Sequence, residues 1–212
     1  MVIGQGATGL KLGLLIDARN RLSLSRMQII FWTILILSSL LVAALGNVNL
    51  GEVSPLSIKI PPEVLGLIGI SATSLVGAPL ILSTKKGHTD SEKEKSRDPG
   101  DEAGRDTKPK EISKEGQVIV NDVPQNAGIS NLFKGDEVGN FVQIDLGKTQ
   151  LFYFTVVLVF TYGVVLGKLF ASSEAVHQLP AIDPGLVWLL GISHAGYLAN
   201  KAVPHSSPNS GD

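Results

Sequence analysis

The sequence lacks cysteine altogether and carries little charge for its length. Without cysteine there can be no disulfide, no thiolate metal site and no cysteine nucleophile. Charged residues make up 17% of the 212 positions, and the formal net charge is −1. This balance gives no electrostatic bias toward a polyanion, so we expect no nucleic-acid partner.

Charge is absent from four long tracts, whose boundaries lie at charged residues. The uncharged tracts cover residues 27–51, 64–84, 149–167 and 184–200. About 20 apolar residues are needed to cross the hydrocarbon core of a bilayer, so the first three tracts are long enough and the fourth is marginal. Buried helices of a soluble all-α domain are the alternative, but such helices are shorter and carry polar residues at every turn. We therefore predict membrane spans near 27–46, 64–83, 149–169 and 185–200.

The chain also repeats itself at an offset of 122 positions, without a gap. The polar and special residues carry this match: Gln28 with Gln150, Thr33 with Thr155, Pro62 with Pro184, and Gly-Ile-Ser at 69–71 with Gly-Ile-Ser at 191–193. Matches between apolar residues mean less, because membrane segments resemble one another in composition. The pattern predicts an all-α transmembrane fold, a four-helix bundle made of two tandem parallel hairpin repeats. Such repeats are related by a pseudo-twofold axis along the membrane normal.

Five regions follow from this layout. They are a cytoplasmic N-terminal segment (1–26), a first hairpin repeat (27–86), a disordered charged loop (87–130), an interfacial lead-in with the second hairpin repeat (131–203), and a disordered tail (204–212). Basic residues gather on the side of the termini and the long loop, so the positive-inside rule predicts that this side is cytoplasmic. The loop is densest in charge up to about Lys114, where it cannot bury enough apolar surface to fold. Apolar residues return from Gly116 onward.

Small residues recur four apart in the second and fourth spans. They are Gly69, Thr73 and Gly77 in one span, and Gly191, Ala195 and Ala199 at the aligned positions of the other. This spacing lets helix backbones approach closely in a membrane. We expect the two spans to pack against each other through these residues, and a homo-oligomer seam is the alternative.

Three polar side chains lie within the predicted spans. Gln28 and Gln150 sit just inside the first and third spans, where they either bond to a neighbouring helix or line a substrate entrance. His194 is the only ionisable residue well inside a span. It is either a neutral packing histidine, satisfied by Ser193 and Tyr197, or a proton relay.

Signs of catalysis are missing from the sequence. It contains no glycine-rich phosphate loop, no histidine and glutamate spacing suited to zinc, and no serine-histidine-aspartate constellation with a plausible pocket. The spans hold no charged residue of the kind that ion-coupled transporters use. We therefore expect a protein that is not an enzyme and that needs no cofactor or metal.

Four stretches together resemble a family of uncharacterised bacterial integral membrane proteins. The stretches are SLSRMQ at 23–28, NLFKGDEVGN at 131–140, DLGKTQ at 145–150 and LLGISHAGYL at 189–198. Members of this family have the same four-span, duplicated layout. The resemblance implies a multi-pass protein of the bacterial inner membrane, and it brings no activity with it.

Three functions remain as hypotheses. The first is a non-enzymatic anchoring or interaction platform in the lipid bilayer, which presents its termini and central loop to protein partners in the cytoplasm. The second is a small transporter or channel subunit, with Gln28, Gln150 and His194 along a pathway between the hairpins. The third, a membrane anchor for a large cytoplasmic assembly, cannot be separated from the first by sequence.

Overall fold

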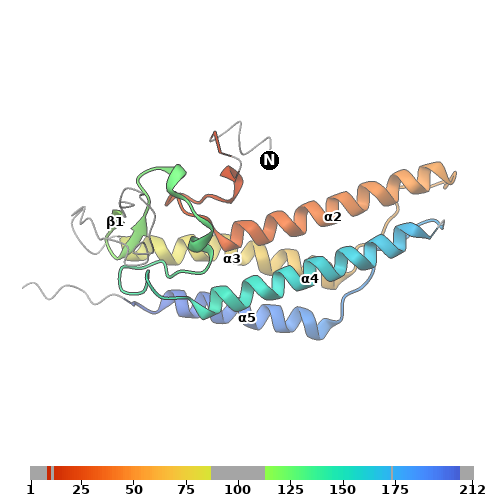
Figure 1. Cartoon of the computed structure of the whole chain (residues 1–212). Helices are drawn as coiled ribbons and strands as arrows, with labels where there is room; N and C mark the ends of the chain where they lie inside the picture. Colours follow the sequence, from red (N-terminus) through yellow and green to blue (C-terminus); the bar gives the residue numbers. More distant parts are fainter. Residues whose placement is uncertain (1–8, 11, 87–112, 173, 206–212) are drawn as a thin grey trace, which may run out of the picture.

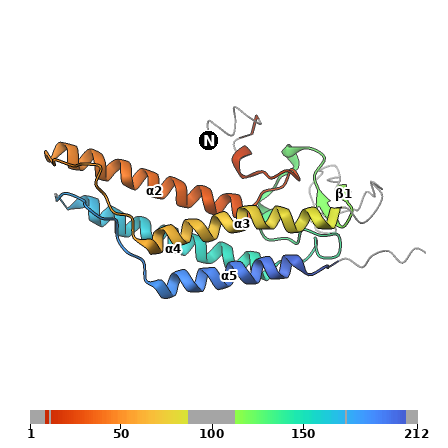
Figure 2. The same ribbon diagram turned by 180° about the vertical axis from the view of Figure 1, so that it is seen from behind.

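A computed structural model describes residues 9–10, 12–86, 113–172 and 174–205. Within these ranges four α-helices lie side by side (Figures 1 and 2): α2 (Leu24–Asn49), α3 (Pro62–Lys86), α4 (Leu146–Ala171) and α5 (Pro184–Ala202). Helix α2 contacts α3 and α4, and α5 contacts the same two helices, with the most extensive contact between α3 and α5. Three of the helices, α2, α3 and α4, are long and apolar enough to cross a membrane. The chain is thus mostly helical, with membrane-spanning character, as the uncharged tracts predict.

A short polar residue or a proline stands at the N-terminus of each of the four helices. The side chains of Ser23 and Asp145 each accept a hydrogen bond from the backbone N–H three residues later and so cap α2 and α4. Pro62 and Pro184 are the first residues of α3 and α5, where a missing N–H costs no helical hydrogen bond. Helix α4 begins and ends 122 positions after α2, and α5 begins 122 positions after α3.

A polar cap covers the end of the bundle where α2 and α4 begin and where α3 and α5 end (Figure 1). We define the cap as the N-terminal arm (12–23) together with residues 113–145. It holds the short helices η1 (Gly13–Leu15), η3 (Pro124–Asn126) and η4 (Ile129–Leu132), and the strands β1 (Ser113–Glu115) and β2 (Val118–Val120).

The strands β1 and β2 form an antiparallel hairpin in which Ser113 pairs with Val120. Gly116 makes the turn at a φ of +60°, and a Cβ there would lie 2.6 Å from the backbone oxygen of Lys86. This ordered hairpin shows that the expected disorder of 87–130 is wrong for 113–130, because Val118 and its neighbours provide buried apolar surface. The charge-dense part of that prediction, 87–112, lies outside the described residues, as does most of the tail.

The opposite end of the bundle is held by one buried asparagine. Asn47, 1% exposed, donates to the backbone oxygens of Pro55 at 3.2 Å and Val176 at 2.9 Å, and its Oδ1 accepts from the N–H of Val176 at 2.8 Å. The backbone of Lys59 also donates to that of His177 at 2.9 Å. The two connections that join the helices at this end are therefore bound to each other.

Helices α3 and α5 pack against each other as expected, but only two of the six small residues face the seam between them. A Cβ at Gly77 would lie 3.5 Å from Leu198, and one at Gly191 would lie 3.6 Å from Ile70, so these two glycines do face the neighbouring helix. The exposed members of the stripes are Gly69, Thr73, Ala195 and Ala199. The buried positions of α3 are Val64, Leu67, Ser71, Ser74, Ala78, Leu82 and Lys85. The prediction of a seam within the chain is wrong at the four exposed positions, and the homo-oligomer alternative stays a prediction.

Candidate functional site: a buried ion cluster beneath the cap

One polar residue from each helix meets inside the bundle. Gln28 of α2 donates through Nε2 to Oγ1 of Thr155 in α4 at 2.6 Å, and the same nitrogen lies 3.4 Å from Nε2 of His194 in α5. The other ring nitrogen of His194 shares a hydrogen bond with the hydroxyl of Ser74 in α3. All four side chains are at most 3% exposed, so the layer ties the four helices together.

The sequence predicts other partners for His194 and Gln150. Ser193 and Tyr197 do not satisfy His194, because its bonds run to neighbouring helices rather than along α5. Gln150 is exposed and donates to Oγ of Ser193 at 3.2 Å, away from the buried layer. Among the three predicted polar residues, the structure brings together only Gln28 and His194.

Apolar side chains adjoin this buried layer on several helices. Trp32, Leu151 and Leu190 each lie one helical turn from a member of the layer, and each is at most 1% exposed. Oε1 of Gln28 and Nε1 of Trp32 have no hydrogen-bond partner among the described residues, whereas the bonds of the layer run from helix to helix.

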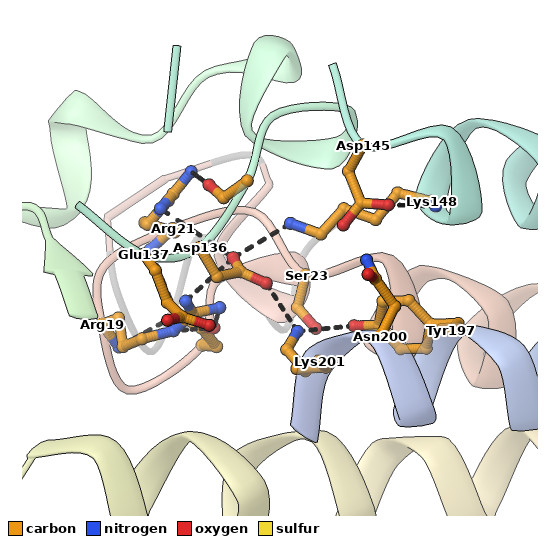
Figure 3. Close-up of polar contacts among 12 residues, drawn as sticks. Arg19, Arg21, Ser23, Asp136, Glu137, Asp145, Lys148, Tyr197, Asn200 and Lys201 are labelled. Carbon is orange, nitrogen blue, oxygen red and sulfur yellow. Dashed lines mark hydrogen bonds and ion pairs between the residues drawn. The ribbon is translucent and has the colours of Figure 1, made fainter. Parts of the chain in front are cut away.

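A second polar group, which sequence reasoning missed, centres on Asp136 in the cap (Figure 3). Its Oδ1 lies 2.9 Å from Nη1 of Arg19 and 2.9 Å from Nζ of Lys148. Its Oδ2 lies 2.6 Å from Nζ of Lys201, and Nη1 of Arg21 is 3.9 Å from Oδ1. The carboxylate thus joins the N-terminal arm, the first turn of α4 and the last turn of α5. All five residues are at most 8% exposed.

The electrostatics of the cluster keep Asp136 ionised. Burial alone would raise the pKa of Asp136, but the surrounding cations, Arg19 first among them, hold that pKa well below its usual range. Burial alone would lower the pKa of Arg19, yet Asp136 and Asp17 together raise it above its ordinary value. The pKa of Arg21 is lowered by burial, which the charge of Asp136 only partly offsets.

A neighbouring ion pair fixes the ends of α3 and α5. Nζ of Lys85 lies 2.6 Å from Oε1 of Glu137 and donates to the backbone oxygens of Lys201 at 2.6 Å and Val203 at 2.8 Å. The second oxygen of Glu137 accepts from the backbone N–H of His205 at 2.9 Å. Lys85 therefore caps the C-terminal carbonyl groups of α5 with a charge of the sign that the helix dipole favours.

We call these eight residues the ion cluster. Its cations are Arg19, Arg21, Lys85, Lys148 and Lys201, and its carboxylates are Asp17, Asp136 and Glu137. Five cations face three carboxylates, so the cluster carries an excess of two positive charges.

A cavity of about 580 Å³ opens beside the cluster, between the N-terminal arm and helices α2 and α3. Its polar wall includes the cations Arg19, Arg26, Lys86, Lys148 and Lys201 and the carboxylates Asp17 and Asp136. Its apolar wall includes Leu14, Leu22, Ile29, Ile30, Leu75 and Leu82.

The side chains of this site are mainly charged. Within the described residues, no group of three or more histidine, aspartate and glutamate side chains is placed to hold a metal ion. The carboxylates are already engaged by cations, which leaves positive charge as the feature that the site offers to a ligand.

The sequence holds only a weak signal of the cluster, one that our predictions did not use. Lys148 stands in the first turn of α4, where the helix dipole disfavours a cation and a negative partner nearby is favourable. Asp136 is 12 positions away in sequence, and local patterns do not reveal which acidic residue folds back.

Comparison with known proteins does not identify a family for the chain. No family model, no curated protein and no solved structure matches it.

Proposed function

We propose that this chain is a non-enzymatic platform of the bacterial inner membrane, which crosses the bilayer four times and presents its cap to protein partners in the cytoplasm. The observation that carries the proposal is the ion cluster around Asp136. Its ion pairs bind the N-terminal arm and the segment before α4 to the first turn of α4 and the last turn of α5. The cap therefore has a fixed position at one end of the bundle. A membrane anchor for a large cytoplasmic assembly is the same proposal with a larger partner.

Helix α5 supports a fourth span. Its 19 residues reach about 28 Å at 1.5 Å per residue, close to the hydrocarbon thickness of about 30 Å. It also lies alongside α3 and α4 (Figure 2). The matching 122-residue offsets of the helix bounds support two tandem repeats, each of which returns to the side where it began.

The distribution of basic residues supports a cytoplasmic cap. The capped end holds the cations of the ion cluster together with Arg26 and Lys86, whereas the opposite end holds Lys59 and Lys168. This asymmetry is what the positive-inside rule associates with the cytoplasmic face.

The buried polar layer argues against a pathway between the hairpins. Gln28 and His194 are bonded to neighbouring helices and at most 3% exposed, and Gln150 lies apart from them on the exposed side of its helix. The platform therefore has better support than the transporter, which stays an alternative.

Orientation can be tested by labelling introduced thiols, because the chain contains no cysteine. Val53→Cys lies at the far end, where the side chain is 98% exposed, and Val123→Cys lies on the cap, where it is 45% exposed. A membrane-impermeant maleimide should label only Val53→Cys in intact cells, and both variants after the inner membrane is permeabilised. Labelling of Val123→Cys in intact cells would contradict the proposed orientation.

The platform itself can be tested by purification of the tagged full chain in a mild detergent, followed by mass spectrometry. The variant Ile129→Asp changes a side chain of the cap that is 67% exposed, and Val53→Asp is its matched control at the far end. A partner that is retained by the native chain and by Val53→Asp, but lost from Ile129→Asp, supports a cap-bound partner. Recovery of no stable partner counts against the platform.

A further inference from the structure

The ion cluster places more cationic than anionic side chains beside the cavity. By formal count its cations outnumber its carboxylates by two. Arg21, 2% exposed, donates through Nη2 to the backbone oxygen of Gly135 at 3.0 Å. Its Nε and Nη1 have no hydrogen-bond partner among the residues that the structure describes. Arg21 does not line the cavity, so the anion site proposed there rests on the other cations.

The cavity extends this positive charge outward from the cluster. Arg26, which is partly exposed, lines it, and within the described chain its guanidinium takes part in no ion pair. Lys86 lines it as well and pairs with Glu115, whose side chain is 53% exposed. An exposed pair contributes little and can be exchanged for a stronger anion.

The opposite wall of the cavity is apolar and runs along the bundle. Ile29 and Ile30 line it from the second turn of α2, and Leu75 and Leu82 line it from α3. Leu75 lies 11 residues before the last residue of α3, which places it about 16 Å from that end. Because α2 and α3 are both apolar enough to cross a membrane, the cavity leads from the charged cap toward the hydrocarbon region.

We propose that this cavity binds one anionic phospholipid, with its phosphate group on the cationic wall and the start of an acyl chain on the apolar wall. A volume of about 580 Å³ is within the usual range for small-molecule sites, about 300–1,000 Å³. Free phosphate would leave the apolar wall in contact with water, and a zwitterionic lipid would bring its own cation toward Arg26 and Lys86. Basic pockets between membrane helices are suited to anionic headgroups.

The test uses the full chain, purified in detergent and stripped of lipid. Phosphatidylglycerol, phosphatidylcholine and inorganic phosphate are titrated separately while the thermal midpoint is measured. At about a 100-fold excess over its Kd, phosphatidylglycerol should raise the midpoint by ~5–10 °C, while the other two change it little. An equal shift with phosphatidylcholine overturns the proposal, and so does a full shift with inorganic phosphate, which would make the site one for a free anion.

Variants locate the effect in the cavity. The double variant Arg26→Gln/Lys86→Gln removes two charges from the cavity wall outside the ion cluster. Lys59→Gln/Lys168→Gln removes two exposed charges from the far end and is the matched control. The cavity variant should lose most of the rise in thermal midpoint that phosphatidylglycerol causes, and the control variant should keep it. Equal rises in the two variants overturn the proposal.

Native mass spectrometry gives a result that does not depend on any variant. The native chain, exposed to an equimolar mixture of the two lipids, should retain one phosphatidylglycerol in preference to phosphatidylcholine. No preference overturns the proposal even if the cavity variant does not fold. Either failure leaves the platform proposal standing, because that proposal does not require a bound lipid.

Discussion

Replacement of Asp136 by asparagine would remove the negative charge at the centre of the ion cluster while nearly keeping the size of the side chain. Three cations lie within 2.9 Å of this carboxylate, a fourth lies at 3.9 Å, and Asp136 is 6% exposed. Removal of one partner from a buried ion pair costs about 3–5 kcal/mol, because the remaining charge is left without compensation. We expect Asp136→Asn to lower the free energy of unfolding by about that amount.

The assay is denaturant unfolding of the full chain in mild detergent, followed by circular dichroism. Asp183→Asn is the matched control, because Asp183 is exposed and caps α5, and asparagine caps a helix about as well as aspartate. Adding Lys148→Met to Asp136→Asn removes one of the uncompensated cations and should recover part of the loss. If Asp136→Asn and Asp183→Asn unfold within about 1 kcal/mol of each other, the cluster does not hold the cap as we argue.

Three further predictions concern pH and the two ends of the bundle. Asp136 has a lowered pKa in the folded protein, so its contribution is present above its ordinary pKa of 3.8 and is lost as the pH falls through the folded value. Acid titration should therefore destabilise the native chain more than Asp136→Asn below about pH 4. Gln28→Met should cost about 0.6–2 kcal/mol in detergent unfolding through the loss of its buried bonds, whereas Gln150→Met, at the aligned exposed position, should cost almost nothing. Asn47→Ala should lower the thermal midpoint strongly, because it leaves buried backbone groups of the connections without partners. The control Asn49→Ala changes an exposed side chain and should leave the midpoint unchanged. Equal effects of the two variants would show that the contacts of Asn47 do not stabilise the fold.

The sequence predicts the helices well because a bilayer imposes a simple requirement. A run of about 20 residues without charge is rare outside a membrane span. Helix α2 contains all but the last two residues of the run at 27–51, and α3 and α4 contain the runs at 64–84 and 149–167. The helix ends extend beyond the predicted spans, since residues such as Ser23 and Asp145 cap the helices in the polar region.

Which face of a membrane helix is buried is harder to predict. A helix that is apolar all round has no polar stripe to mark its outer face, so the small residues of α3 served as the guide. The structure buries Ser71 and Ser74 and leaves Gly69 and Thr73 exposed. Small size alone does not distinguish a residue that faces a helix from one that faces lipid.

The ion cluster could not be predicted because two explanations compete for the same residues. Arg19, Arg21, Lys148 and Lys201 all flank spans, and the positive-inside rule accounts for each of them without a partner. Only the fold brings them to Asp136, across 117 positions in the case of Arg19. The same cations attach the cap, and in the proposed orientation they also mark the cytoplasmic side.

That separation of 117 positions also bears on how the protein is made. At about 5–20 residues per second, the ribosome adds Asp136 roughly 6–23 s after Arg19. During this interval Arg19 has Asp17 as a partner, but the central carboxylate of the ion cluster is not yet present. Closure of the cap therefore requires the second half of the chain and is a late step in folding.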